Sequence, residues 1–180
     1  MRAERMRIFI GCEGESEQAY VACLHRLAET QGRRVHLDGR VLREGDPLSR
    51  IEYAARLIDK LERQRGGYAH RFALLDFDQV ERDPERQRRA TQIADDANIA
   101  IIWQRPAHEA LLLAHFADAP ARQFATPAEA LAQLVRIWPG YAKNLPSPKY
   151  CEHIGLEGVR LAAHQDHALT DLLTLAGLIA

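Results

Sequence analysis

Several features are scarce in this chain of 180 residues, and each scarcity argues against a class of protein. The three cysteines form no metal-like spacing, and their odd number argues against a disulfide framework, so we expect a reducing, cytoplasmic compartment. The apolar run at residues 8–10 is far too short for a signal peptide, and no stretch approaches the length of a membrane span. We therefore expect no association with a membrane.

Net charge and glycine-rich loops are also lacking. The formal charge is −1, so any binding of nucleic acid must come from a local patch of basic residues. Those residues are mostly arginine and lie mainly before Pro106. No P-loop, no Rossmann glycine motif and no nucleophile elbow is present, so ATP hydrolysis would need a partner protein.

The composition that remains is that of a folded domain. Hydrophobic residues make up 47% of the chain and charged residues 27%, without a signature of disorder. A chain of this length fits one domain that buries a core without disulfides.

The first half of the chain alternates apolar runs with helical periodicity. Strands are expected at residues 8–10, 35–41, 72–75 and 99–103, with helices between them. Such alternation predicts an α/β fold with a doubly wound parallel sheet, in an order of about 2-1-3-4. Only the second strand alternates apolar and polar residues, so it is expected at an edge. Asp46-Pro47 and Asp83-Pro84 are predicted helix starts.

The second half reads as helical. Helices are expected at residues 110–116 and 127–137, with two shorter ones from Gly158, and residues 138–150 are expected to form a loop. We divide the chain into an α/β core at residues 1–105 and a helical extension at residues 106–180 that packs on it within one compact domain.

Acidic residues follow the two central strands. Glu13 comes directly after the first strand, and Asp76 and Asp78 end the third. Side chains two apart on an extended chain point the same way, so both aspartates can face one point beside Glu13. Three carboxylates at one place require a hard cation, which predicts a site for Mg²⁺ or Mn²⁺. Gly14 would let a substrate phosphate approach the backbone. Either motif alone occurs commonly by chance, and their pairing on central strands favours the metal site.

Four segments together resemble a known family. Residues 12–20 read C-E-G-E-S-E-x-x-Y, residues 106–116 read P-x-H-E-A-L-L-L-x-H-F, residues 141–143 read Y-x-K, and residues 76–78 read D-x-D. Their order is similar to that of the RloB-like family, which occurs near restriction and phage-defence loci, and the strand-Glu and D-x-D pattern resembles the Toprim fold. The resemblance covers nearly the whole chain. His108 and Leu111 depart from the aromatic residue and the Trp of the family segment, which bears on the packing of that helix.

This resemblance implies a nuclease-like activity and an ATPase partner. It also implies roles for Glu17 and Glu109 as additional metal ligands and for Lys143 as a catalytic cation. Each has a plainer interpretation, because acidic residues are favoured in a first helical turn and loop lysines are usually solvated.

Other polar residues near these motifs are weaker candidates. Arg86, Arg88 and Arg89 follow the D-x-D segment and are predicted to line an approach for a polyanion, and Lys149 is a second cation in the loop of Lys143. The plainer interpretation is that most charge runs are solvated faces. We expect His115 to be a structural histidine rather than a phosphate donor.

The preferred hypothesis is metal-dependent phosphodiester cleavage of DNA or RNA, with Asp76 and Asp78 on the metal and Glu13 as general acid or base. The main alternative is a non-catalytic Toprim-like subunit that binds nucleic acid or a partner protein in a defence complex. A phosphatase of the D-x-D type is disfavoured, since Val80 stands where those enzymes place Thr. The choice between DNA and RNA stays open, as does the oligomeric state, with a homodimer among the alternatives.

Overall fold

The computed structural model describes residues 5–77, 83–120 and 123–180. Its sheet contains four parallel strands in the order β2-β1-β3-β4, which confirms the predicted order. The strands are β1 (Met6–Cys12), β2 (Val35–Val41), β3 (His70–Asp76) and β4 (Ala100–Gln104). β2 lies at an edge, as its alternating pattern predicted. β1 and β3 are neighbours, so the point where the strand order reverses lies between their carboxyl ends.

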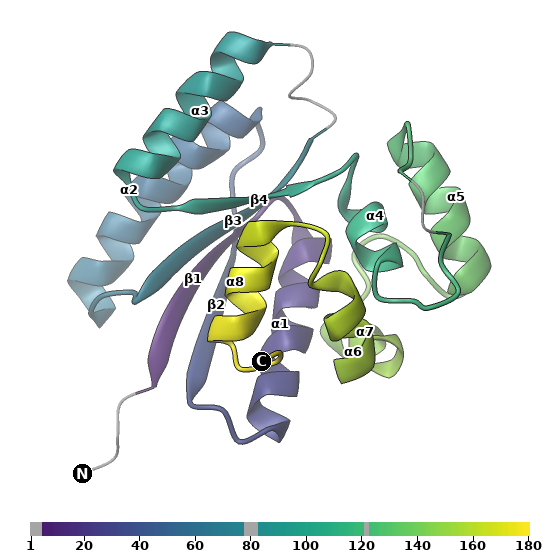
Figure 1. Cartoon of the computed structure of the whole chain (residues 1–180). Coiled ribbons are helices and arrows are strands. Elements are labelled where there is room, and N and C mark those ends of the chain that lie inside the picture. The colour runs from purple at the N-terminus through teal and green to yellow at the C-terminus, as the bar shows by residue number, and fades with distance from the viewer. Residues whose placement is uncertain (1–4, 78–82, 121–122) are drawn as a thin grey trace.

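Helices cover both faces of this sheet, and the first half of the chain supplies one layer to each (Figure 1). α1 (Glu15–Thr30) packs on one face, and α2 (Pro47–Arg65) and α3 (Pro84–Asp96) pack on the other. Successive residues of a strand point to opposite faces, so Ile8 and Ile10 enter the core under α1 while Phe9 enters the core under α2. This double coverage explains why the central strands are continuously apolar.

Local capping signals set the starts of α2 and α3. The Asp46 carboxylate accepts a hydrogen bond from the Ser49 N–H at 2.8 Å, and the Asp83 carboxylate accepts one from the Arg86 N–H at 3.1 Å. In both helices a proline follows the cap, where its missing N–H costs no hydrogen bond. Both predicted starts are confirmed.

The described part of the second half of the chain, residues 106–120 and 123–180, adds five helices to the α1 face. They are α4 (His108–Leu113), α5 (Pro127–Ile137), α6 (Ser147–His153), α7 (Leu156–Ala162) and α8 (His167–Leu175). Their apolar side chains join those of α1 and the sheet in one core, in which Trp138 and Tyr150 are among the largest fully buried residues.

Two predictions for this half were wrong in detail. The segment expected to be a loop up to residue 150 contains the start of α6, because Pro148 lies in the first helical turn, where proline is tolerated. The helix expected at residues 110–116 begins and ends a little earlier, as α4. Across the described part of the chain, no helix combines the length and apolar character that crossing a bilayer would need.

Candidate acidic site at the carboxyl ends of the central strands

Glu13 and Asp76 meet at the switch point of the sheet. β1 and β3 pair in register up to Cys12 and Leu74, so both residues stand where their strands end. The Glu13 Oε2 accepts a hydrogen bond from the Asp76 backbone N–H at 2.9 Å. The structure therefore brings together two of the three positions predicted to bind metal. Asp78, the third, lies outside the described residues, as does Val80.

An arginine that the sequence analysis missed completes this contact. The Arg50 Nη1 lies 2.6 Å from the Glu13 Oε1, and the two side chains are only 9% and 12% exposed. Arg50 comes from α2, on the opposite face of the sheet from α1. The sequence does indicate that Arg50 faces the core, because it lies four residues before Ala54 and eight before Ile58, on the buried side of the helix. An arginine in phase with a buried stripe needs an anionic partner.

Glu17 belongs to a second group of polar residues, at the start of α1. It is 5% exposed, and its Oε2 accepts a hydrogen bond from the Gly14 N–H at 3.0 Å. Its Oε1 lies 3.9 Å from the His108 Nδ1. Burial raises the pKa of the Glu17 carboxyl, opposed by its hydrogen bonds with the backbone and by the charges of Arg50 and Lys143. Glu15, the other acidic residue of this turn, is exposed.

Glu109 faces the same region from α4 and is 4% exposed. Its Oε1 accepts a hydrogen bond from the Tyr141 hydroxyl at 3.4 Å and lies 3.7 Å from the Lys143 Nζ. The Lys143 side chain is 71% exposed, so its ammonium group extends from this pair toward solvent. Burial raises the pKa of the Tyr141 hydroxyl, with Tyr150 and Glu109 adding to the shift, so this hydroxyl stays protonated and remains a donor.

The loop that carries Lys143 is attached to α1. The Asn144 backbone N–H donates to the Ser16 Oγ at 3.0 Å.

Burial is also the main reason that the pKa of Tyr150 is raised to about 12. Residues from α1, α4 and this loop thus form one buried polar group around Glu17 and Glu109.

His115 is a satisfied structural residue. Its Nδ1 lies 3.0 Å from the Leu111 carbonyl oxygen, which can only accept, so this nitrogen carries the proton. Its Nε2 then accepts from the Tyr20 hydroxyl at 3.2 Å. Burial lowers the pKa of His115 to about 4, which keeps the ring neutral. This geometry supports the structural interpretation.

The other predicted substrate-binding residues lie on the surface. Arg86 forms an ion pair with Asp46, and Lys149 forms one with Glu152 at 2.9 Å. Arg89 is exposed on α3. The structure places none of these three in the buried polar group, and their predicted contact with a polyanion stays a prediction.

Among residues 5–77, 83–120 and 123–180, no three His, Cys, Asp or Glu side chains are grouped closely enough to hold a metal ion. This range lacks Asp78, one of the predicted ligands. The metal site therefore stays a prediction, with Glu13 and Asp76 as its described members.

Comparison with protein families gives one match. The family model described as RloB-like protein matches residues 8–171. A search of curated proteins gave no match. The matched range begins within β1 and ends within α8, so it contains the whole acidic site and the loop that carries Lys143.

Proposed function

Because this chain belongs to the RloB-like family, we propose that it is a Toprim-type nuclease that uses Mg²⁺ or Mn²⁺ to cleave phosphodiester bonds in nucleic acid. The observation that carries the proposal is the contact between Glu13 and Asp76 at the ends of the two central strands. Open α/β sheets bind their ligands at this place, outside the carboxyl ends of the strands where the order reverses.

The donors at this place suit a hard divalent cation. Mg²⁺ and Mn²⁺ prefer carboxylate oxygens, and Asp76 supplies one such group at the strand end. Glu13 adds a second carboxylate beside it, held by the Arg50 guanidinium and by the Asp76 N–H. Asp76 and Asp78 would hold the cation, which would supply charge stabilisation at the scissile phosphate.

We propose that Glu13 moves a proton in this reaction. Arg50 and the Asp76 N–H fix the orientation of its carboxylate from two sides, and a general base works only when it is held within reach of the proton that it takes. In this proposal Glu13 accepts a proton from the attacking water while Arg50 holds the carboxylate in position.

Lys143 would contribute charge at the rim of the site. Its ammonium group is anchored at Glu109 and exposed to solvent, so it can meet a phosphate as nucleic acid arrives. Tyr141 and the Asn144–Ser16 hydrogen bond hold the loop that presents it. Glu109 then acts as an anchor for this cation, in addition to the predicted role of Glu109 and Glu17 as metal ligands.

One observation favours the alternative of a non-catalytic subunit. The Glu13 carboxylate is already in an ion pair with Arg50, as a purely structural carboxylate would be. In that case the protein binds nucleic acid or a partner protein without cleaving it. An ATPase partner, which the family resemblance implies, belongs to both versions of the proposal.

Cleavage assays separate the two. Labelled single strands, duplex DNA and a structured RNA are incubated with the protein and millimolar Mn²⁺, with and without an ATPase encoded nearby. Metal-dependent cleavage that is lost in Asp76→Asn and kept in Glu157→Gln supports the nuclease, because Glu157 is a surface carboxylate on α7 with an 87% exposed side chain. Binding without cleavage under all of these conditions supports the non-catalytic subunit.

A further inference from the structure

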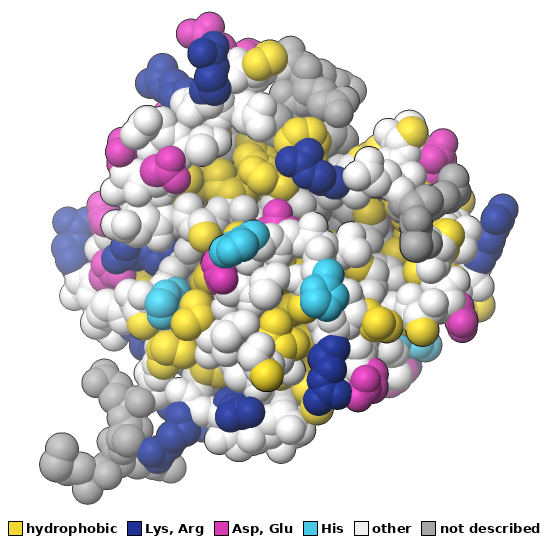
Figure 2. All heavy atoms as spheres, viewed as in Figure 1, with side chains coloured by type: hydrophobic (Ala, Val, Ile, Leu, Met, Phe, Trp, Pro, Cys, Tyr) yellow, Lys and Arg dark blue, Asp and Glu magenta, His cyan; other side chains and the backbone are white. Residues whose placement is uncertain are grey.

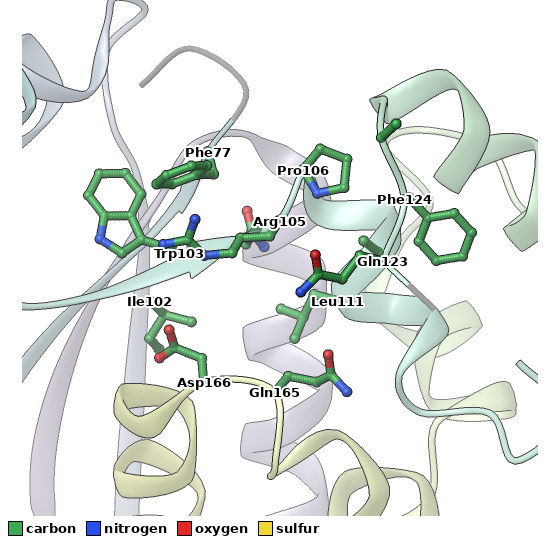
Figure 3. Close-up of a pocket in the computed structure, with 13 residues that line it drawn as sticks. Phe77, Ile102, Trp103, Arg105, Pro106, Leu111, Gln123, Phe124, Gln165 and Asp166 are labelled. Carbon is green, nitrogen blue, oxygen red and sulfur yellow. The ribbon is translucent and has the colours of Figure 1, made fainter. Parts of the chain in front are cut away.

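A cavity opens beside the acidic site, at the ends of β3 and β4. Its volume is about 410 Å³, within the range of roughly 300–1,000 Å³ that is typical of small-ligand sites. Phe77 and Arg105 line one side, Ile102 and Leu111 form an apolar floor, and Gln165 and Asp166 lie across from Arg105 (Figure 3). Nothing in the proposed cleavage chemistry uses these residues.

Its first wall is a stack of flat groups. The Arg105 guanidinium carbon lies 3.5 Å from the centre of the Phe77 ring. Trp103 meets the same ring edge to face, with 5.7 Å between ring centres. On the surface, Figure 2 shows an apolar patch bordered by a basic side chain over the region where β3 and β4 end in Figure 1. An aromatic ring and a guanidinium plane are the groups on which proteins stack unpaired bases.

The buried amide of Gln104 gives an independent sign of a ligand. Gln104 lines the cavity and is 2% exposed. Its Nε2 lies 2.6 Å from the His108 Nδ1, and its Oε1 has no hydrogen-bond partner among the described residues. Rotating the amide by 180° would only exchange its oxygen and nitrogen, so one buried polar atom of Gln104 lacks a hydrogen-bond partner in either orientation within the described part of the chain. Leaving such a group unsatisfied costs free energy, which a ligand that bonds to it would recover.

The charge of the cavity selects the kind of ligand. The Asp166 carboxylate caps α8 through the Leu169 N–H at 3.2 Å and also lines the cavity. Arg105 lies on the opposite side of the cavity, so the two charges offset each other, and the Asp166 carboxylate can accept from the N–H groups that a nucleobase carries on its edge. With the amides of Gln104 and Gln165, the cavity offers hydrogen-bonding groups of both kinds beside an apolar floor.

We propose that this cavity binds one unpaired nucleobase, stacked on the cavity side of the Arg105–Phe77 pair with its edge against Gln104 and Asp166. A base within a duplex is paired and stacked on its neighbours, so the protein selects single strands or loops. The site gives the proposed nuclease a means to position its substrate, and to that extent this inference rests on the proposed function.

The cavity is connected directly to the acidic site. Asp76 pairs with Gln104 in the sheet, and Phe77, the next residue, donates its backbone N–H to the Gln104 carbonyl oxygen at 2.9 Å. A base held by Phe77 therefore has its own phosphate groups near Asp76 and Glu13. Recognition of the base and cleavage of the chain would occur on consecutive residues, Asp76 at the end of β3 and Phe77 directly after it.

Binding is tested without metal, in EDTA, so that no cleavage is needed. The probe is a single-stranded oligonucleotide in which one base is 2-aminopurine, whose fluorescence falls when it stacks. We expect quenching with the wild-type protein and at least tenfold weaker binding of a duplex, and of an oligonucleotide of equal charge that is abasic at that position. Phe77→Leu, which keeps the apolar bulk, and Arg105→Ala should each weaken binding roughly fivefold or more, as loss of a base stack does. Arg136→Ala, an exposed arginine of α5, is the matched control and should bind as the wild type does.

The outcomes separate this inference from the proposed function. Base-dependent binding that falls in Phe77→Leu supports the cavity even if the protein cleaves nothing. Equal binding of the intact and abasic probes overturns it, as does unchanged binding in both Phe77→Leu and Arg105→Ala, even if metal-dependent cleavage is observed. Melting temperatures of the variants within a few degrees of the wild type establish that a loss of binding is not a loss of fold.

Discussion

The Glu13 carboxylate and the Arg50 guanidinium lie 2.6 Å apart and are almost completely shielded from water. The glutamate ends the central strand β1, and the arginine reaches it from α2. The residue proposed to move a proton is thus oriented by a cation from a separate element of the fold. This pair is the basis of the first two predictions.

Glu13→Gln should remove cleavage while nucleic-acid affinity stays nearly unchanged. Glutamine keeps the shape of the side chain and one acceptor oxygen but cannot take a proton, and loss of general acid–base help costs about 10²–10⁴ in rate. Affinity should depend on Arg and Lys contacts with phosphates. Single-turnover cleavage with Mn²⁺ is the measurement, with Glu157→Gln as the control. Equal cleavage by the wild type and Glu13→Gln would make Glu13 structural.

Arg50→Ala should destabilise the fold by about 3–5 kcal/mol, because removing one member of a buried ion pair leaves its partner charge in a poorly solvated place. Urea unfolding measures the loss. Arg136→Ala should change the free energy of unfolding by no more than about 0.5 kcal/mol, as surface substitutions usually do. If Glu13→Gln combined with Arg50→Ala is no more stable than Arg50→Ala alone, the two side chains are not coupled as the structure shows.

Millimolar Mn²⁺ should raise the melting temperature of the wild-type protein, because a ligand that binds only the native state stabilises it by mass action. Asp76→Ala and Asp78→Ala should each lose this shift and the heat of Mn²⁺ binding in calorimetry, whereas Glu157→Gln should keep both. A melting temperature that does not respond to Mn²⁺ would remove the metal from the proposal.

Acid should destabilise the protein through its buried histidines. Burial lowers the pKa of His108 and of His115 to about 4, against 6.5 for an exposed ring. Between these values the unfolded chain binds protons that the native state does not, so the free energy of unfolding falls as the pH drops from 6.5 toward 4. Each histidine contributes on the order of 3 kcal/mol across this window. His115→Gln should flatten the pH dependence measured by urea unfolding. His167→Gln, at a ring that is 93% exposed, should leave it unchanged.

The fold could be predicted from the sequence because its signals are local. A strand covered on both faces is apolar at every position, and a helix start is marked by two adjacent residues such as Asp46 and Pro47. The βαβ connections predict parallel strands, and the alternating pattern of the second strand, which puts it at an edge, indicates their order. The start of α6 was missed because a cluster of prolines and glycines also marks loops.

Less of the candidate site could be predicted. The meeting of Glu13 and Asp76 follows from strand order, since both come directly after neighbouring strands. The contact of Arg50 with Glu13 does not, because it depends on how far α2 extends over the end of β1. The cavity had no sequence signal at all, as Phe77, Arg105 and Asp166 come from three separate segments that only the folded chain brings together.

The acidic site draws its parts from helices on both faces of the sheet, and this has a mechanical consequence. Arg50 belongs to the α2 layer, while Glu17 and Glu109 belong to the layer of α1 and α4. The distance between the two layers therefore sets the spacing of the charges. A core substitution such as Ile58→Ala, far from any charged group of the site, lets α2 settle closer to the sheet and moves Arg50 with it. A displacement of about 1 Å can cost roughly 10² in rate. The packing of the apolar core under α2 therefore affects the rate of the proposed reaction through the position of Arg50.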